Sequence, residues 1–214
     1  MKSAPVSHKG RRRGRRLAGD TPGREALLKA AISWFARRGF DGASLRSIAA
    51  DAGVDIALIA CLFGSKAELW QAVVEHLAER QAKNITRISE IAQDNNLNSA
   101  QALALLIELY AQISLELPEF FAFFMQEISN PGERLDFIMK KLIDPFSAAC
   151  MPIIKAAMAS GVIRKSDPML YLELLLAGVL MTTVSPALHR RYRSKKNLCN
   201  GIMREAKFVF MNGI

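Results

Sequence analysis

The sequence predicts an all-α protein of about nine helices. Apolar residues recur at helical spacing through nearly the whole chain after residue 20. Proline and glycine fall mostly at the ends of these periodic segments, and no segment alternates as a strand would. The chain has 214 residues, of which 50% are apolar and 23% are charged, so it is long enough to bury a hydrophobic core.

Cysteine usage and hydropathy exclude several classes of protein. Cys61, Cys150 and Cys199 are odd in number, widely separated and not in a zinc-ligand spacing, so we expect neither a disulfide framework nor a bound metal. A reducing, cytoplasmic environment fits best. The most apolar run, from Leu174 to Val184, is shorter than the roughly 18 residues that span a bilayer, and no secretory signal is visible, so we expect no membrane partner.

No pattern typical of an enzyme is present. The sequence contains no P-loop, no glycine-rich dinucleotide turn and no nucleophile elbow. His8, His76 and His189 are too scattered to suggest a site. We therefore expect no catalytic residues and no cofactor.

Positive charge is concentrated at the start of the chain. Residues 1–19 contain seven basic residues and no acid, so they carry +7 of the net charge of +9 and the remaining residues carry only +2. Such a segment buries no apolar surface, and we expect it to be a disordered arm. Two interpretations remain open: a solubilising tail, or an arm that lies along nucleic-acid phosphates.

A first unit is expected over residues 20–66. Its first helix begins at Pro22 after the capping residue Thr21, presents an apolar face and ends at Gly39.

Two short helices follow in this unit, joined by a tight turn. Ser44 is a good cap for the first of them and Asp55 for the second. Between them, the small Ala49 allows a close crossing, Gly53 makes the turn with a positive φ, and Ile59 packs back into the core. This spacing meets the needs of a helix-turn-helix.

The second unit, residues 67–214, is expected to be a helical body. Ser65, Ser99 and Asp167 are its predicted caps, and Pro145 and Pro152 are expected to bend a long helix. The predicted helices are 66–92, one from 99, one from 118, 132–160, 168–184 and 195–212, with "SPALHRRYRSKK" as a basic connector before the last.

The segment "ALLKAAISWFARRGFDGASLRSIAADAGVDIALIACLFGSKAELW", residues 26–70, resembles the TetR-type transcriptional regulators. The resemblance rests on the order Ala31, Phe35, Gly39, Phe40, Ser44, Ile48, Ala49, Ala52, Gly53, Val54, Phe63, Lys66 and Leu69. It implies an all-α homodimer with a C-terminal ligand pocket and a DNA-binding head that releases operator DNA when a small molecule binds.

The third helix departs from the family's pattern. Members commonly have Tyr and His where this chain has Cys61 and Leu62, and often a polar residue where it has Ala60. The helix therefore offers apolar contacts and one weak thiol in place of several groups that hydrogen-bond to base edges.

The resemblance and the local chemistry together give a set of predicted DNA contacts. They are Ser44, Arg46, Ile56, Ala57, Ala60, Cys61 and Lys66, with Arg11, Arg12, Arg13, Arg15 and Arg16 of the arm. Arg46 would pair with guanine, the apolar residues would meet thymine methyl groups, and Lys66 would meet a phosphate. Solvated surface residues, a third helix that reads nothing, and a sensor thiol at Cys61 are the open alternatives.

A ligand pocket is predicted around the aromatic segment "FFAFFM". The predicted lining residues are Tyr110, Phe120, Phe121, Phe124, Met125, Met139, Phe146, Cys150 and Met151. Few charged residues occur among them, so an apolar effector with one polar group is the hypothesis, and simple core packing is the alternative for any single residue.

A dimer interface is predicted on the last two long helices. Its residues are Leu172, Leu175, Leu176, Val179, Leu180, Ile202, Ala206, Val209 and Phe210. This apolar surface exceeds what one small core needs.

The sequence thus predicts a cytoplasmic, homodimeric, ligand-responsive regulator, nucleoid-associated when bound, whose partners are double-stranded DNA at a palindromic operator and an apolar effector. The alternative is a ligand- or partner-binding protein whose head has lost specific DNA recognition, with a helical enzyme as a third hypothesis.

Overall fold

A computed structural model describes residues 22–116, 118–192 and 194–211 of the chain. These residues are predominantly helical and contain no strand, so the predicted all-α class is confirmed. The helices are α1 (Pro22–Gly42), α2 (Leu45–Asp51), α3 (Ala57–Leu62), α4 (Lys66–Gln93), α5 (Ser99–Glu116), α6 (Pro118–Ile128), α7 (Glu133–Ile138), the π-helical η1 (Met139–Ile143), α8 (Asp144–Ala159), α9 (Pro168–Thr183), α10 (Pro186–Arg191) and α11 (Lys195–Met211).

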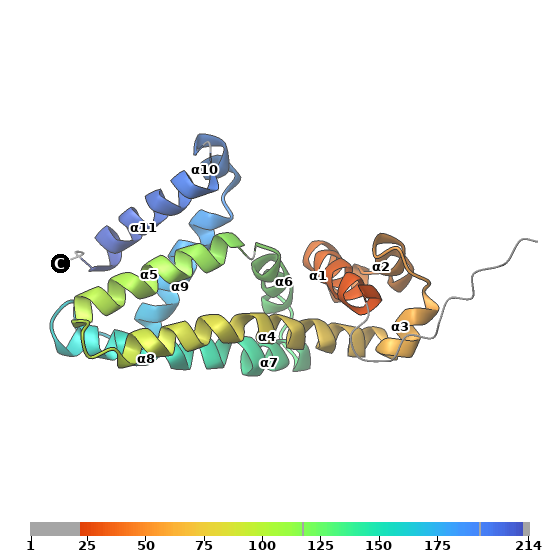
Figure 1. The fold of residues 1–214 in the computed structure, drawn as a ribbon, viewed down its shortest axis with the longest axis horizontal. Coiled ribbons are helices and arrows are strands. Elements are labelled where there is room, and N and C mark those ends of the chain that lie inside the picture. Colours follow the sequence, from red (N-terminus) through yellow and green to blue (C-terminus); the bar gives the residue numbers. More distant parts are fainter. Residues whose placement is uncertain (1–21, 117, 193, 212–214) are drawn as a thin grey trace, which may run out of the picture.

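The helices form a head and a body joined by the long α4 (Figure 1). Helices α1 to α3 lie at one end of α4, while α5, α8 and α9 pack in the body at its other end. Helix α6 stands between them and packs extensively on α1. One continuous core of buried apolar side chains runs through both parts.

Most predicted caps are present, with one correction. Ser65 and Glu68 form a reciprocal capping box at the start of α4, as its sequence predicts. At α5 the cap is Asn98 and not Ser99: Asn98 Oδ1 accepts from the Gln101 amide, and Gln101 Oε1 accepts from the Asn98 amide, both at 2.9 Å. Ser99 is therefore the first helical residue, because these reciprocal bonds place the cap one residue earlier, at Asn98.

The predicted helix at 132–160 is a continuous helical run in three parts. Helices α7, η1 and α8 follow one another without a loop, and the π-helical turn lies directly before Pro145. A proline has no amide hydrogen to donate, and the altered hydrogen-bonding register of a π-turn accommodates this loss without ending the helix. The predicted basic connector also contains a helix, α10, which Ser185 caps through the Leu188 amide.

The run Glu133–Ala159 is long and apolar enough, by length and composition, to cross a membrane, which the sequence analysis did not anticipate. In the fold, α8 packs against α4, α5 and α9. Its apolar residues are therefore explained by the core that they help to form.

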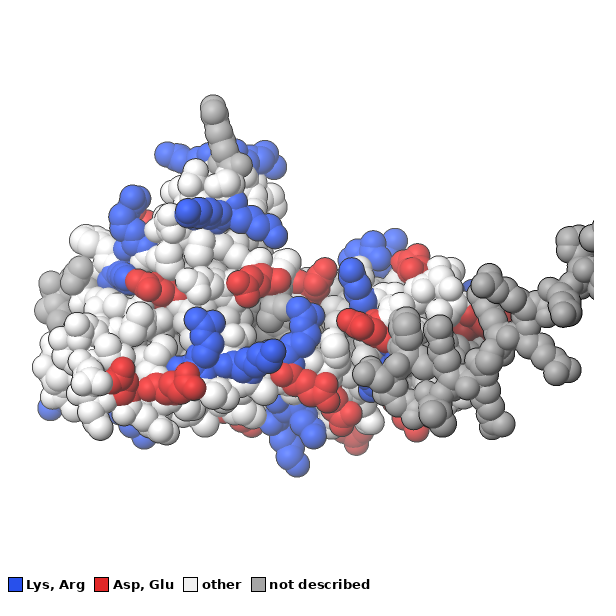
Figure 2. Space-filling model, viewed as in Figure 1, with Lys and Arg blue, Asp and Glu red and all other residues white. Residues whose placement is uncertain are grey.

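The surface of the visible face carries acidic and basic side chains interspersed (Figure 2). This pattern agrees with a near-neutral body, because residues 20–214 carry a net charge of only +2.

Candidate functional site

The turn between α2 and α3 has the geometry that its sequence predicts. Gly53 has φ +66°, and the Val54 amide donates to the Ala49 carbonyl at 3.0 Å. Ala49 and Ile59 are almost completely buried. A small residue, a left-handed glycine and a buried aliphatic residue thus hold the two helices at close approach.

Polar caps fix the first turns of both helices. Ser44 Oγ accepts a hydrogen bond from the Ser47 amide at 3.5 Å, and Asp55 Oδ1 accepts one from the Ala57 amide at 2.8 Å. These bonds satisfy amides that would otherwise have no helical partner. The outer surfaces of α2 and α3 are therefore held on a short but fixed scaffold.

Among the described residues that were predicted to meet DNA, all but the half-buried Lys66 are exposed. Arg46 is exposed and forms no ion pair with any residue that the structure describes. On α3, Ala57, Ala60 and Cys61 are exposed, and the side chain of Ile56 remains 46% exposed. The only large apolar side chain of this group, that of Ile56, is therefore not covered by the core of the head.

Lys66, like Ser44, also has partners within the head. Its Nζ donates to the Asp41 carbonyl at 3.2 Å and lies 4.8 Å from the centre of the Phe40 ring. The ammonium thus joins the start of α4 to the end of α1 and retains donors for a phosphate. The arginines of the arm and the predicted cap Thr21 lie outside the described residues.

A partly buried ion pair lies where the body meets the head. Glu127 on α6 is only 2% exposed, and its Oε2 accepts from Arg134 Nε at 2.9 Å. The Arg134 guanidinium lies 4.4 Å from the centre of the Phe40 ring of α1. Phe40 follows Gly39, where α1 is kinked at φ +68°. Arg134 therefore links the far end of α6 to the kink of α1.

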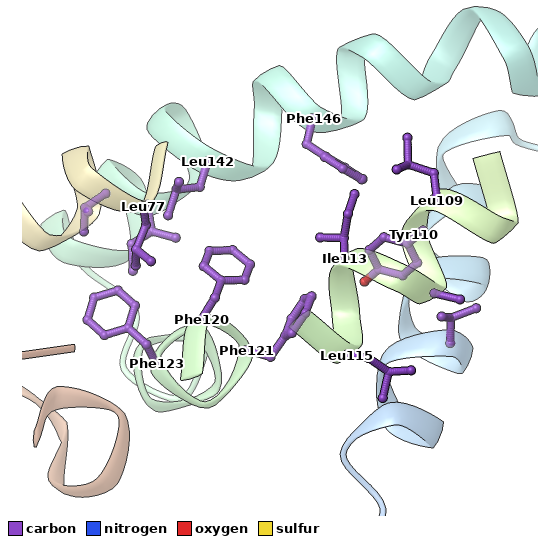
Figure 3. Packing of buried hydrophobic residues seen from close by; sticks show 14 of the residues in the cluster. Leu77, Leu109, Tyr110, Ile113, Leu115, Phe120, Phe121, Phe123, Leu142 and Phe146 are labelled. Atoms are coloured by element: carbon purple, nitrogen blue, oxygen red, sulfur yellow. The ribbon is translucent and has the colours of Figure 1, made fainter. Parts of the chain in front are cut away.

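The other end of α6 closes a cavity in the body. Figure 3 shows Phe120 and Phe121 rising from α6 towards Ile113 and Tyr110 of α5, with Phe146 of α8 across from them. The cavity has a volume of about 60 Å³. It is lined by Leu77, Gln81, Tyr110, Ile113, Phe120, Phe121, Ile143, Phe146, Ser147 and Leu176.

Four of the nine predicted ligand-contacting residues line this cavity: Tyr110, Phe120, Phe121 and Phe146. The other five lie elsewhere. Phe124, Met139 and Met151 are half-buried, Met125 is 49% exposed and Cys150 is completely buried in the core. Burial raises the pKa of the Cys150 thiol to about 12, and burial also raises the pKa of the Tyr110 hydroxyl.

Sequence analysis missed the polar lining residues Gln81 and Ser147. Both are buried, at 8% and 5% exposure. Gln81 continues the four-residue steps of the apolar face of α4 after Val73 and Leu77. A glutamine on this otherwise apolar face was the sequence signal for a buried polar residue, because side chains on that face point into the core.

Most residues of the predicted dimer interface pack within their own chain. Leu172, Leu175, Val179, Ile202 and Ala206 are buried in the protomer. Leu176 lines the cavity, Leu180 and Phe210 are half-buried, and Val209 is 58% exposed. The first five residues are thus covered by the body's own core and not available to a second chain.

Comparison with known families decides the identity of the head. A family model described as bacterial regulatory proteins of the TetR family matches residues 27–73, from the buried face of α1 to the first turns of α4. The head of this chain matches the DNA-binding domain of the TetR family. The match includes the whole helix-turn-helix and both of its caps.

Two curated relatives are named as HTH-type transcriptional repressors. The chain is 35% identical over 71 residues to a nicotine-responsive transcriptional repressor of Paenarthrobacter nicotinovorans, a match covering 33% of this chain and 37% of that protein. It is 28% identical over 160 residues to the transcriptional repressor NicS of Pseudomonas putida, a match covering 73% of each chain. The first similarity therefore spans about a third of the relative's length.

Solved structures share the fold along most of the chain. A Clostridium perfringens protein described as a fatty acid metabolism regulator superposes with a TM-score of 0.70 at 24% identity, covering 88% of this chain and 98% of that one. The Bacillus subtilis regulator FadR, in complex with stearoyl-CoA, gives a TM-score of 0.65 at 17% identity, covering 89% and 98%. The all-helical body thus has the architecture of these regulators, in addition to the matched head.

Proposed function

We propose that this chain is a cytoplasmic transcriptional repressor that binds operator DNA through α2 and α3 and leaves it when a small molecule enters the cavity. The observation that carries the proposal is the helix-turn-helix itself, with Gly53 in the left-handed region and the outer surfaces of both helices exposed. The family assignment and two relatives named as repressors support it.

DNA recognition in this proposal divides between two chemistries. Arg46 supplies the hydrogen bonds that discriminate base pairs, and Ile56, Ala57 and Ala60 supply contacts to thymine methyl groups. The basic arm adds phosphate contacts that carry affinity without sequence preference.

We propose a homodimer, with an interface shifted from the one that the sequence predicts. The exposed large apolar residues of α9 are Met169, Leu170, Leu174 and Met181, and α11 adds Phe208 and Val209. Two such faces bury one another in a two-fold dimer, so that two heads meet half-sites about one helical turn, ~34–36 Å, apart.

The effector acts by population shift. Helix α6 carries Phe120 and Phe121 at the cavity and Glu127 at the Arg134–Phe40 contact with the head. A ligand that binds better when α6 has moved favours a head arrangement that no longer fits the operator. The relatives' names point to different ligands, nicotine in one and stearoyl-CoA in another, so the ligand of this chain is argued from its own cavity below.

Selection from random DNA with the full chain tests the proposed function. We expect a palindromic site to be enriched, and DNA containing it to protect exposed Cys61 from alkylation by N-ethylmaleimide while buried Cys150 resists in every sample. If no site is enriched and binding shows only a steep salt dependence, about 0.9 per phosphate contacted, the head binds DNA without specificity. That result would favour the alternative of a ligand- or partner-binding protein.

A further inference from the structure

Gln81, one of the residues that line the cavity, has a buried polar atom that no described residue satisfies. The Oε1 atom of Gln81 is inaccessible to solvent and accepts no hydrogen bond from any residue that the structure describes. The residue is 8% exposed and lines the cavity together with Ser147, which is 5% exposed. A buried acceptor without a donor is costly, and in native folds such an atom is normally paired with protein, water or a ligand.

The remaining wall restricts what can supply that donor. Tyr110, Phe120, Phe121 and Phe146 give the wall its aromatic character. Among the described lining residues there is no Asp, Glu, Lys, Arg or His that could pair with an ionised ligand. An ion in this cavity would lose its hydration without gaining a counter-charge, which disfavours carboxylates and ammonium groups alike.

We propose that Gln81 is the specificity-determining residue for the ligand, which is an uncharged, mainly apolar molecule with one N–H or O–H group donating to Gln81 Oε1. The inference rests on the proposed role of the cavity as the effector site. A cavity of about 60 Å³ holds only part of such a molecule, so the aromatic residues on α6 must move as it enters. The donor group anchors one end of the ligand on α4 while its apolar body displaces α6.

Three related aromatic probes test the proposed ligand chemistry in the absence of DNA. These are p-cresol, which has a donor, toluene, which lacks it, and 4-methylbenzoate, which is an anion. Calorimetry on the full-length protein should show p-cresol binding about tenfold more tightly than toluene, because only the phenol satisfies the acceptor. The benzoate should bind most weakly.

The variant Gln81→Leu should abolish the preference for p-cresol, because it removes the acceptor and keeps the bulk. Gln71→Leu is the matched control, since Gln71 lies exposed on the same helix. Without ligand, Gln81→Leu should raise the Tm by about 2–4 °C, as relief of an unsatisfied buried group would. The control should leave both the probe preference and the Tm unchanged.

Equal affinities for p-cresol and toluene, preference for the benzoate, or no binding of any probe would overturn the proposal. So would a lower Tm for Gln81→Leu, which would show that Gln81 has structural partners in the fold. None of these readouts involves DNA. If the probe tests fail but selection from random DNA enriches an operator, the proposed repressor function stands and only the ligand proposal falls. If the probe tests succeed but no operator is enriched, the chain is a ligand-binding protein.

Discussion

The outer face of α3 and the wall of the cavity are both mainly apolar, but for opposite reasons. On α3, small apolar side chains and Ile56 face solvent, where a DNA groove would have to cover them. In the cavity, aromatic side chains face inward and enclose the polar Gln81. Polar groups are few in each region, and we propose that Arg46 and Gln81 carry the hydrogen-bonded specificity while the apolar residues provide shape.

The largest effect is expected at Arg134, which links α6 of the body to Phe40 of α1 in the head. Arg134→Leu should lower the free energy of unfolding by about 2–3 kcal/mol, because it leaves the buried Glu127 carboxylate without a partner, while the partial exposure of Arg134 limits the loss. Urea unfolding measures this loss. Arg204→Leu is the control, because its partner Glu205 is exposed and the loss should stay below about 1 kcal/mol.

Adding Glu127→Gln to Arg134→Leu should restore most of the lost stability, since the buried group is then uncharged. A loss in Arg134→Leu no greater than in the Arg204 control would show that the ion pair does not hold head and body together. In that case the proposed route from cavity to head would need another contact.

The next largest effect concerns Arg46. Arg46→Ala should reduce the preference for the selected operator over random DNA by about 10- to 100-fold, the value of one good bidentate contact. Thermal stability should not change, because the side chain is exposed. Fluorescence anisotropy with competitor DNA measures the preference, and Arg87→Ala, an exposed arginine on α4, is the control. Operator preference that survives Arg46→Ala would refute the proposed division between Arg46 and α3.

A smaller effect is expected at the turn between α2 and α3 in the head. Gly53→Ala is expected to lower stability by about 1–2 kcal/mol, the cost of a side chain in the left-handed region. An added Cβ meets no atom within 4 Å, so the loss is one of backbone conformation and not of packing. Gly53→Asn should lose less, because asparagine tolerates this conformation better. Equal losses in calorimetric scans would point to packing instead.

The smallest effect is expected from pH. Burial, followed by the positive charge of Arg80, lowers the pKa of His76 below 6.5 in the folded state, while Glu79 and Glu25 act in the opposite direction and Arg24 adds to the lowering.

The His76 imidazole therefore binds a proton more readily in the unfolded chain than in the folded one. Its contribution to the stability of the fold is complete above pH 6.5 and is lost as the pH falls below that value. Tm measured from pH 7.5 to 5 should therefore fall less steeply for His76→Gln than for the wild type. Parallel curves would contradict this.

Local features of the sequence were sufficient to predict the helices and the head. Caps such as Ser65 and Asp167 act within one turn, and Gly53 requires only its own φ, so each can be recognised without knowing the fold. The cap at Asn98 was missed because two adjacent residues could both serve, and only the reciprocal bonds with Gln101 distinguish them.

The body shows what local patterns cannot decide. Helix α9 is apolar on nearly every side, so its sequence does not tell which residues face the core. Packing against α5, α8 and α11 buries Leu172, Leu175 and Val179 and leaves Leu170 and Leu174 exposed, which moves the proposed dimer surface by a fraction of a turn.

By itself, the sequence determined that this chain is all-α, that its head is a helix-turn-helix and that the outer residues of α3 are apolar. These properties depend on residues close together along the chain. Only the tertiary structure brought Gln81 into the wall of an aromatic cavity, with its Oε1 unpaired among the described residues, and set Arg134 between Glu127 and Phe40. Such environments depend on helices distant in sequence meeting at one point, and helical periodicity fixes the face of a residue but not the neighbour that it meets.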